Sequence, residues 1–299
     1  MARRTSERKA VSEGGRTKGM RCVDAHHHLW NYSAEEYGWI GPEMAALQRD
    51  FTPTDLRAEM TAAGVDACVA VQARETLEET QWLLRLAHAN DFIAGVVGWA
   101  PIAGAEFAQD LEALAANTKL KGLRYVLQAL PAEYMLSDAF ERGMQVLEGS
   151  GLVYDILIFE RQLEAAIAMV DRHPTQGFVV DHVAKPKIAA RAMEPWAARM
   201  RAMARRENVH CKVSGMTTEA DWRQWTVEDL RPYFDVVLES FGPERLLAGS
   251  DWPVCTLAVS YRRWWQVLRE MVNGLSESEQ AMILGGNAER VYGLSEVAR

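Results

Sequence analysis

Eight short apolar segments recur along the chain, each followed by a longer segment with the pattern of a helix. The apolar segments are rich in Val, Leu, Ile and Ala and nearly continuous in hydrophobicity, which is typical of strands buried in a parallel sheet. They cover Arg21–Ala25, Ala67–Ala73, Ile93–Ala100, Leu120–Leu127, Leu152–Leu157, Gly177–Val183, Val209–Gly215 and Leu246–Ser250. Helical patterns between them include Thr76–Asn90, Glu106–Asn117, Arg161–Arg172, Arg191–Arg206 and Val227–Phe241.

Eight strand–helix alternations in 299 residues predict an α/β fold, a single (β/α)8 TIM-type barrel. A doubly wound open sheet is the alternative, and the lack of a Gly-rich nucleotide-binding loop argues against it. Residues 1–19 are polar and aperiodic, so we expect a disordered N-terminal tail followed by one barrel over residues 20–299. Met20, just before the first apolar segment, is an alternative start.

Charge and cysteine content narrow the class of protein. The net charge is −8, and because the first twenty residues carry six basic and two acidic groups, the rest of the chain carries about −12. So negative a net charge over residues 21–299 does not favour binding to the phosphate backbone of nucleic acid. No apolar run is long enough to span a bilayer. The four cysteines are far apart and form no CxxC pair, which indicates a reduced, cytoplasmic protein. Whether the chain forms a homo-oligomer stays open.

A histidine-rich stretch ends the first predicted strand. Cys22 and Val23 lead into Asp24 and then His26, His27 and His28. Side chains alternate along a strand, so His26 and His28 are expected to share one face and His27 to point the other way. Two imidazoles on one face can form part of a metal site or a proton-transfer pair. A structural cluster is the alternative.

Polar residues also end most of the other predicted strands. They are Gln72 and Arg74, Arg124, Asp155, Asp181 and His182, Lys212 and Ser214, and Asp251. Functional residues of a barrel gather at the carboxyl ends of its strands, so these side chains are candidates for one common site. For one of them alone, such as Lys212, a buried ion pair is an equally good explanation.

The sequence motifs around these residues resemble those of a known family. Asp24-Ala25-His26-His27-His28-Leu29-Trp30, Asp181-His182-Val183-Ala184-Lys185-Pro186 and Gly249-Ser250-Asp251-Trp252-Pro253-Val254 are similar to motifs of the amidohydrolase superfamily, in its amidohydrolase-2 branch. Gly122-Leu123-Arg124 and Lys212-Val213-Ser214-Gly215 fit the same pattern. The resemblance spans about residues 21–294 and is strongest to sugar lactonases of the L-fuconolactonase and L-rhamnonolactonase type. It implies a barrel that hydrolyses a cyclic ester.

The resemblance also implies a metal site, but two residues of this chain differ from the metal ligands that many superfamily members use. Many superfamily members use a strand-4 lysine and a strand-5 histidine for a second metal, where this chain has Arg124 and Asp155. We therefore expect one divalent ion at most, held by His26, His28, His182 and Asp251. Three histidines and a carboxylate suit zinc. Some relatives work without metal, so the requirement for it stays open.

The expected mechanism uses Asp251 as general base on a water molecule that attacks the lactone carbonyl. A metal, Arg124 or a histidine such as His182 would stabilise the oxyanion, and Asp251 or a histidine would return the proton to the ring oxygen. The alternative for Asp251 is an N-cap on the following segment.

The substrate expected from these residues is a neutral aldonolactone. Trp30 and Trp252 could offer apolar faces to a sugar ring, although most tryptophans of such a chain are core residues. Gln72, Asp155, Lys212 and Ser214 could bind hydroxyl groups. A carboxylated lactone of the pyrone-dicarboxylate or muconolactone type is the alternative, since Arg74, Arg124, Arg161 and Lys212 could pair with carboxylates. A decarboxylase of the same superfamily and a noncatalytic binding barrel are weaker alternatives.

Overall fold

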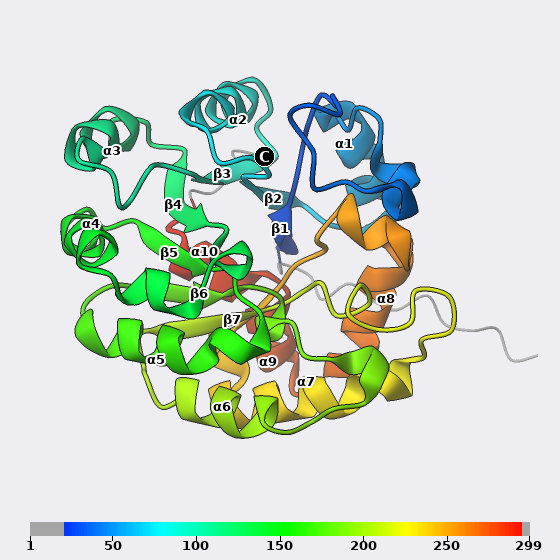
Figure 1. The fold of residues 1–299 in the computed structure, drawn as a ribbon. Helices are drawn as coiled ribbons and strands as arrows, with labels where there is room; N and C mark the ends of the chain where they lie inside the picture. The colour runs from blue at the N-terminus through cyan, green and yellow to red at the C-terminus, as the bar shows by residue number, and fades with distance from the viewer. Residues whose placement is uncertain (1–20, 295–299) are drawn as a thin grey trace, which may run out of the picture.

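The computed structural model describes residues 21–294, so the predicted N-terminal tail and Met20 lie outside the described residues. Eight parallel strands follow one another around the sheet in chain order, with helices outside them (Figure 1). The strands are β1 Val23–His27, β2 Ala67–Val71, β3 Ile93–Gly98, β4 Leu120–Tyr125, β5 Val153–Ile156, β6 Phe178–Val180, β7 Val209–Val213 and β8 Leu246–Ala248. The predicted (β/α)8 barrel is confirmed.

The helices cover the outer face of the strands. They are α1 Pro53–Ala63, α2 Leu77–Ala89, α3 Phe107–Ala115, α4 Asp138–Glu148, α5 Leu163–Arg172, α6 Trp196–Met203, α7 Val227–Phe241, α8 Tyr261–Val272, α9 Glu277–Ala281 and α10 Asn287–Val291. Several begin at a side chain that accepts a backbone N–H, as Thr52 does for α1 and Thr226 does for α7. None of the helices in this part of the chain has the length and apolar character that a membrane span requires.

Side-chain contacts and a short bridge, instead of a regular ladder, join β8 to β1. The backbone N–H of Asp251 donates to His26 O at 2.8 Å, and that of His28 donates to Trp252 O. Below these bonds, the Asp24 carboxylate accepts from the Ser250 N–H at 2.8 Å and from the Ser250 hydroxyl at 2.6 Å. The seam that closes the barrel therefore fixes the segment after β8 against the end of β1.

An irregularity in β1 sets which of its histidines face inward. Asp24 pairs with Cys68 of β2 and His27 pairs with Ala70, so three steps on β1 match two on β2. Such a bulge turns a side chain toward a new direction. His27 consequently lies on the face of Asp24, while His26 and His28 point into the barrel.

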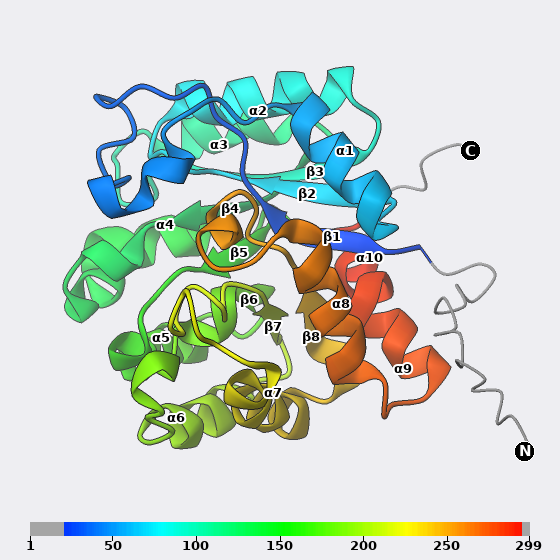
Figure 2. The ribbon, with the colours of Figure 1, turned by 90° about the vertical axis from the view of Figure 1, so that its right-hand side faces the viewer.

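Two apolar layers hold the barrel. One fills the space between strands and helices, and a smaller one fills the interior, where Val69, Val179 and Leu247 meet Ala288 and Tyr292 of the C-terminal segment. Figure 2 shows α10 at the end of the barrel where β1 begins, and the loop after β1 at the opposite end. The carboxyl ends of the strands thus open away from the chain termini of the described region.

Candidate active site

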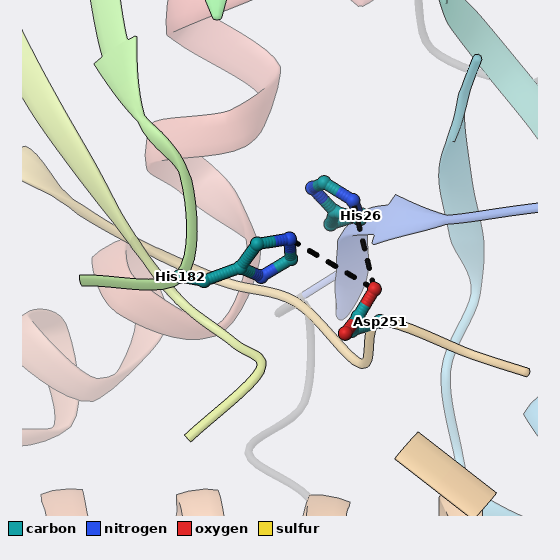
Figure 3. A group of neighbouring side chains, drawn as sticks. All are labelled: His26, His182 and Asp251. Carbon is teal, nitrogen blue, oxygen red and sulfur yellow. Dashed lines mark ion pairs between the residues drawn. The ribbon is translucent and has the colours of Figure 1, made fainter. Parts of the chain in front are cut away.

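Four side chains from three separate strand ends meet at the carboxyl end of the barrel. His26 and His28 come from β1, His182 follows β6 and Asp251 follows β8; three of them are drawn in Figure 3. Asp251 Oδ1 lies 3.4 Å from His28 Nε2, 3.8 Å from His26 Nε2 and 3.9 Å from His182 Nε2. The two β1 imidazoles approach each other at 3.2 Å between their Nε2 atoms. The structure therefore brings these four side chains, which the sequence proposed as metal ligands, close together.

The other ring nitrogen of each histidine has its own partner. His28 Nδ1 donates to Val71 O at 2.8 Å, His182 Nδ1 lies 2.9 Å from Ser214 Oγ, and His26 Nδ1 lies 3.3 Å from Asp181 Oδ1. A carbonyl or carboxylate at Nδ1 favours the tautomer whose Nε2 carries a lone pair. The Val71 carbonyl thus fixes the His28 tautomer whose Nε2 lone pair faces Asp251.

Two glycines leave room for the rings. A Cβ at Gly215, which has φ +63°, would lie 2.6 Å from His182 Nδ1. A Cβ at Gly249 would lie 3.0 Å from the Cβ of His26. Both positions follow the strands that flank the site, so any larger residue would displace a histidine.

Backbone hydrogen bonds hold Asp251 in place, and its carboxylate faces the three histidines. Its φ is +58°, in the left-handed region that costs an L-residue about 1–2 kcal/mol. Its N–H donates to His26 O, and its carbonyl accepts from Cys255 N at 2.8 Å. The 3₁₀ turn Val254–Leu257 is preceded by Pro253 without a side-chain cap, so the alternative of Asp251 as an N-cap is wrong.

The segment after β6 differs from the prediction. The strand ends at Val180, and His182, Val183, Ala184 and Lys185 all adopt positive φ, between 47° and 58°. A strand that continued through Val183, as the sequence predicts, would place Asp181 and His182 on opposite faces, and this prediction is wrong. The left-handed turn brings both into the barrel mouth, where Asp181 contacts His26 and His182 faces Asp251.

A buried ion network lies beneath His26. Lys212 Nζ contacts His26 Nδ1 at 3.2 Å and Asp181 Oδ1 at 3.0 Å, and it also bonds Asp155. The Tyr292 hydroxyl donates to Asp155 at 2.8 Å. Lys212 and Asp155, which the sequence suggested for hydroxyl binding, are fully buried in this network.

Arg124 lies behind His26. Its Nη1 is 3.3 Å from His26 Nε2 and 3.1 Å from Asp181 Oδ2, and its other nitrogens donate to the side chain and backbone of Gln72. Arg124 therefore holds the imidazole ring of His26 and the side chain of Gln72 in place. Because the guanidinium offers only donors, the Gln72 oxygen faces it and the Gln72 amide nitrogen points away. Among residues 21–294 that buried nitrogen has no hydrogen-bond partner.

Burial and charge set the protonation of the cluster. Burial lowers the pKa of His26 well below its ordinary value and that of His182 to about 4, so both rings are neutral at pH 7. Burial would raise the pKa of Asp251, but His182 and His28 outweigh it and the net shift is downward. The carboxylate facing the rings is therefore ionised.

The group fits a divalent metal. The atoms of His26, His182 and Asp251 lie within 4.8 Å of one another, and His28 Nε2 adjoins two of them. Bonds of about 2.0–2.2 Å to zinc place tetrahedral ligand atoms about 3.3 Å apart, near the shorter separations here. Three imidazoles with partnered Nδ1 atoms and one carboxylate are a donor set that zinc accepts.

The two tryptophans proposed to contact the substrate, Trp30 and Trp252, are buried among other aromatic residues. Trp30 is fully buried, donates through Nε1 to Arg49 O at 2.9 Å, and lies with its ring 6.4 Å from that of His28. Trp252 is nearly buried, with its ring 5.2 Å from that of Phe51. Both pack behind the site as core residues do.

Two further polar residues near Asp251 were not selected from the sequence. Lys185 ends the left-handed turn, and its charge lowers the pKa of both His182 and Asp251. Glu219, in the loop after β7, lies with Oε1 4.0 Å from Lys185 Nζ. The quoted motif around His182 contained Lys185, but nothing local to residue 219 marked it.

The amidohydrolase family model matches residues 23–294. Over 292 residues, the chain is 41% identical to L-fucono-1,5-lactonase of Burkholderia multivorans, with 94% of this chain and 98% of that protein covered. It is 35% identical to L-fucono-1,5-lactonase of Burkholderia ambifaria, with 90% and 94% covered.

A solved structure shows the same fold. The crystal structure of an amidohydrolase from Burkholderia multivorans with bound zinc is 38% identical and superimposes with a TM-score of 0.88, covering 92% of this chain and all of that one. The fold and the family resemblance predicted from the motifs are thereby confirmed.

Proposed function

This chain belongs to the amidohydrolase family, and from that premise we propose that it is a hydrolase that opens the ring of a neutral sugar lactone. The observation that carries the proposal is the 41% identity to an L-fucono-1,5-lactonase over nearly the whole of both chains. The ionised Asp251, which faces the imidazoles of His26, His28 and His182, supplies the base that such a reaction needs.

In the proposed reaction, Asp251 takes a proton from water as the water oxygen bonds to the lactone carbonyl carbon. Among the described residues the buried Gln72 amide nitrogen has no hydrogen-bond partner, and we assign it to donate to the substrate. The bond from the carbonyl carbon to the ring oxygen then breaks, and Asp251 or His182 returns a proton to that oxygen. The products are one carboxylic acid and one new hydroxyl group.

His26, His28, His182 and Asp251 would hold a divalent ion, with zinc as the candidate. When bound, such an ion polarises the carbonyl and lowers the pKa of water. Arg124, Lys212 and Asp181 act as positioning residues that fix the His26 ring, and Ser214 fixes His182.

A neutral substrate is favoured because three of the four cations considered for carboxylate binding are already paired; the fourth, Arg161, lies with its guanidinium over the Phe159 ring. Arg124 pairs with Asp181 at 3.1 Å and Arg74 with Glu36 at 2.9 Å, while Lys212 pairs with Asp155 and Asp181. A substrate carboxylate would have to displace these anions, which is costly for the buried pairs. The carboxylated-lactone alternative is therefore the weaker one.

We also propose a role in carbohydrate catabolism in the cytoplasm. Cys68, Cys211 and Cys255 are buried free thiols, which suits a reducing compartment.

The test is a panel of aldono-1,5- and 1,4-lactones, carboxylated lactones and aromatic acids, assayed with a pH indicator and accompanied by metal analysis. We expect acid release from at least one neutral aldonolactone. Turnover of carboxylated lactones alone would favour the alternative lactonase, and carbon dioxide release from an aromatic acid would favour a decarboxylase. Removal of metal by a chelator, followed by readdition of zinc, tests the metal requirement.

A further inference from the structure

The left-handed turn after β6 places a lysine beside the catalytic group at a conformational cost. Four consecutive residues with positive φ are unusual, because each costs about 1–2 kcal/mol, and Val183 is β-branched. The turn is held by the Lys185 N–H donating to His182 O at 2.8 Å and by Trp196 Nε1 donating to Val183 O at 2.7 Å. Strain of this kind persists where the surrounding structure enforces it, often at functional sites.

Phe159, Lys185 and Glu219 follow the carboxyl ends of β5, β6 and β7, so all three lie at the end of the barrel that carries the site. After burial and the nearer charges, the charge of Lys185 also lowers the pKa of His182 and of Asp251, which agrees with this placement. The Lys185 ammonium also lies 5.5 Å from the ring centre of Phe159, in the loop after β5. Phe159, Lys185 and Glu219 therefore form one side of the site mouth, which we call the β5–β7 wall.

Glu219 is fixed in this wall by its backbone. Its carbonyl accepts from the Ala189 N–H at 2.9 Å, which ties the loop after β7 to the segment after β6. Its side chain is 23% exposed and that of Lys185 is 19% exposed, so both are partly desolvated yet reachable.

The distance between Lys185 Nζ and Glu219 Oε1 allows a substrate hydroxyl group to contact both side chains. At 4.0 Å the two charges attract but make no direct hydrogen bond. The ammonium has three donors and the carboxylate only acceptors, so a hydroxyl group can accept from one and donate to the other. A carboxylate on the substrate would be repelled by Glu219, and an amine would be repelled by Lys185. The pair thus matches a neutral, hydroxylated ligand.

We propose that Lys185 and Glu219 are specificity-determining residues that bind adjacent hydroxyl groups of the lactone ring. The proposal rests on the lactonase activity proposed above and names the part of the site that recognises its substrate. The aromatic face of Phe159 would lie against the C–H side of the ring.

The experiment compares Lys185→Met and Glu219→Gln with the wild-type protein on L-fucono-1,5-lactone and on δ-valerolactone, which has no ring hydroxyl. Hydrogen bonds to charged groups are strong enough that each change should raise KM for the hydroxylated lactone about 10- to 100-fold. The kcat for it should stay within about threefold, because the interaction exists in ground and transition states alike. The loss of kcat/KM on δ-valerolactone should be at least about tenfold smaller.

Matched controls are Lys187→Met and Glu228→Gln. Lys187 lies two residues further along the same segment and pairs with Glu160 at 2.9 Å, and Glu228 is exposed in the first turn of α7. Both should leave KM unchanged. Lys185→Arg, which keeps a charged donor, should restore part of the affinity.

The outcomes separate this inference from the proposed function. If the wild-type protein hydrolyses the hydroxylated lactone but neither variant raises its KM, the inference is overturned while the function stands. A fall in kcat alone, equal on both lactones, would overturn it as well, since Lys185 would then act only through Asp251. If the wild-type protein hydrolyses no lactone, the proposed function itself fails.

Discussion

At the scale of single residues, backbone hydrogen bonds hold Asp251 in place, and its carboxylate caps no helix and faces three imidazoles. Asp251→Asn keeps the shape and removes the basicity. A general base is worth about 10²–10⁴-fold, so kcat should fall at least that far on the best aldonolactone while circular dichroism and the unfolding midpoint stay near those of the wild type. Near-normal turnover would show that another group takes the proton.

The three consecutive histidines should respond differently to substitution. His26→Ala and His28→Ala remove rings that face Asp251, so both should lose bound metal in elemental analysis and activity with it. His27 lies on the outer face of β1, and burial lowers its pKa to about 3, so it packs as a neutral core ring. His27→Ala should keep its metal and lower the free energy of unfolding by about 2–4 kcal/mol. Equal metal loss in all three would contradict the observed facing of β1.

Residue types and spacing predicted the four central side chains but not the network beneath them. HxH at a strand end, a histidine after β6 and an aspartate after β8 could be read from the sequence. The burial of Lys212 and Asp155 could not, because Tyr292, which binds Asp155, lies 137 residues further along the chain. Gln72 was selected for its position, and its bonds to Arg124 explain why its amide nitrogen stays available.

At the scale of elements, the left-handed turn should be eased by glycine. Ala184 is buried at φ +58°, a conformation that glycine adopts without steric cost. Ala184→Gly should therefore raise the free energy of unfolding by about 1 kcal/mol in a denaturant titration. The matched change Ala166→Gly, at a buried position inside α5, should lower it by about 1 kcal/mol or more. A similar loss in both variants would mean that the turn carries no strain.

The turn between β2 and α2 should give the fold a pH dependence. Glu79 Oε2 accepts from the backbone N–H groups of Ala73 and Arg74 at 3.0 and 2.7 Å, and burial raises the pKa of Glu79 from 4.5 to about 7. The folded state therefore binds this proton more tightly than the unfolded chain. The resulting stabilisation is complete below pH 4.5 and is lost as pH rises through 7.

Glu79→Gln keeps the acceptor oxygen and removes the titration. The free energy of unfolding of this variant, minus that of the wild type, should increase by up to about 3 kcal/mol between pH 5 and pH 8. Urea titrations of both proteins across that range measure the difference, in which the other titrating groups cancel. A difference that does not change with pH would show that Glu79 is ionised throughout.

Element boundaries were predictable where apolar periodicity ends cleanly, as for α7, Val227–Phe241. They were not predictable after β6, where the predicted strand Gly177–Val183 runs three residues beyond the observed end at Val180. The pattern of apolar residues is the same in both conformations, and the left-handed turn depends on a contact from Trp196 in a later helix. The strand-alternation rule therefore failed for Asp181 and His182, although it gave the correct facing for His26 and His28.

At the scale of the whole molecule, eight strand–helix alternations were sufficient to predict the barrel, because each buried strand needs a helix over its outer face. The way in which the barrel closes was not predictable. Closure between β8 and β1 depends on Asp24 and Ser250, which are 226 residues apart in sequence, and on the backbone of Asp251. The closing seam thus carries Asp251, the proposed general base, so the fold and the candidate site share the same contacts.

The net charge of the whole molecule leads to the last prediction. The chain carries −8, Arg124 and Lys212 are paired with carboxylates, and Lys185 faces Glu219. A neutral lactone should therefore show a kcat/KM that changes less than about twofold between about 0.01 M and 1 M salt, over which the Debye length falls from about 30 to 3 Å. A carboxylated lactone is repelled at long range at low salt, so any slow hydrolysis of it should become faster as salt rises. Side-by-side initial rates on both lactones, with a neutral ester as a control for salt effects on the chemistry, measure this. Efficient hydrolysis of the carboxylated lactone with a KM that rises on added salt would instead indicate a free cation in the site and a charged natural substrate.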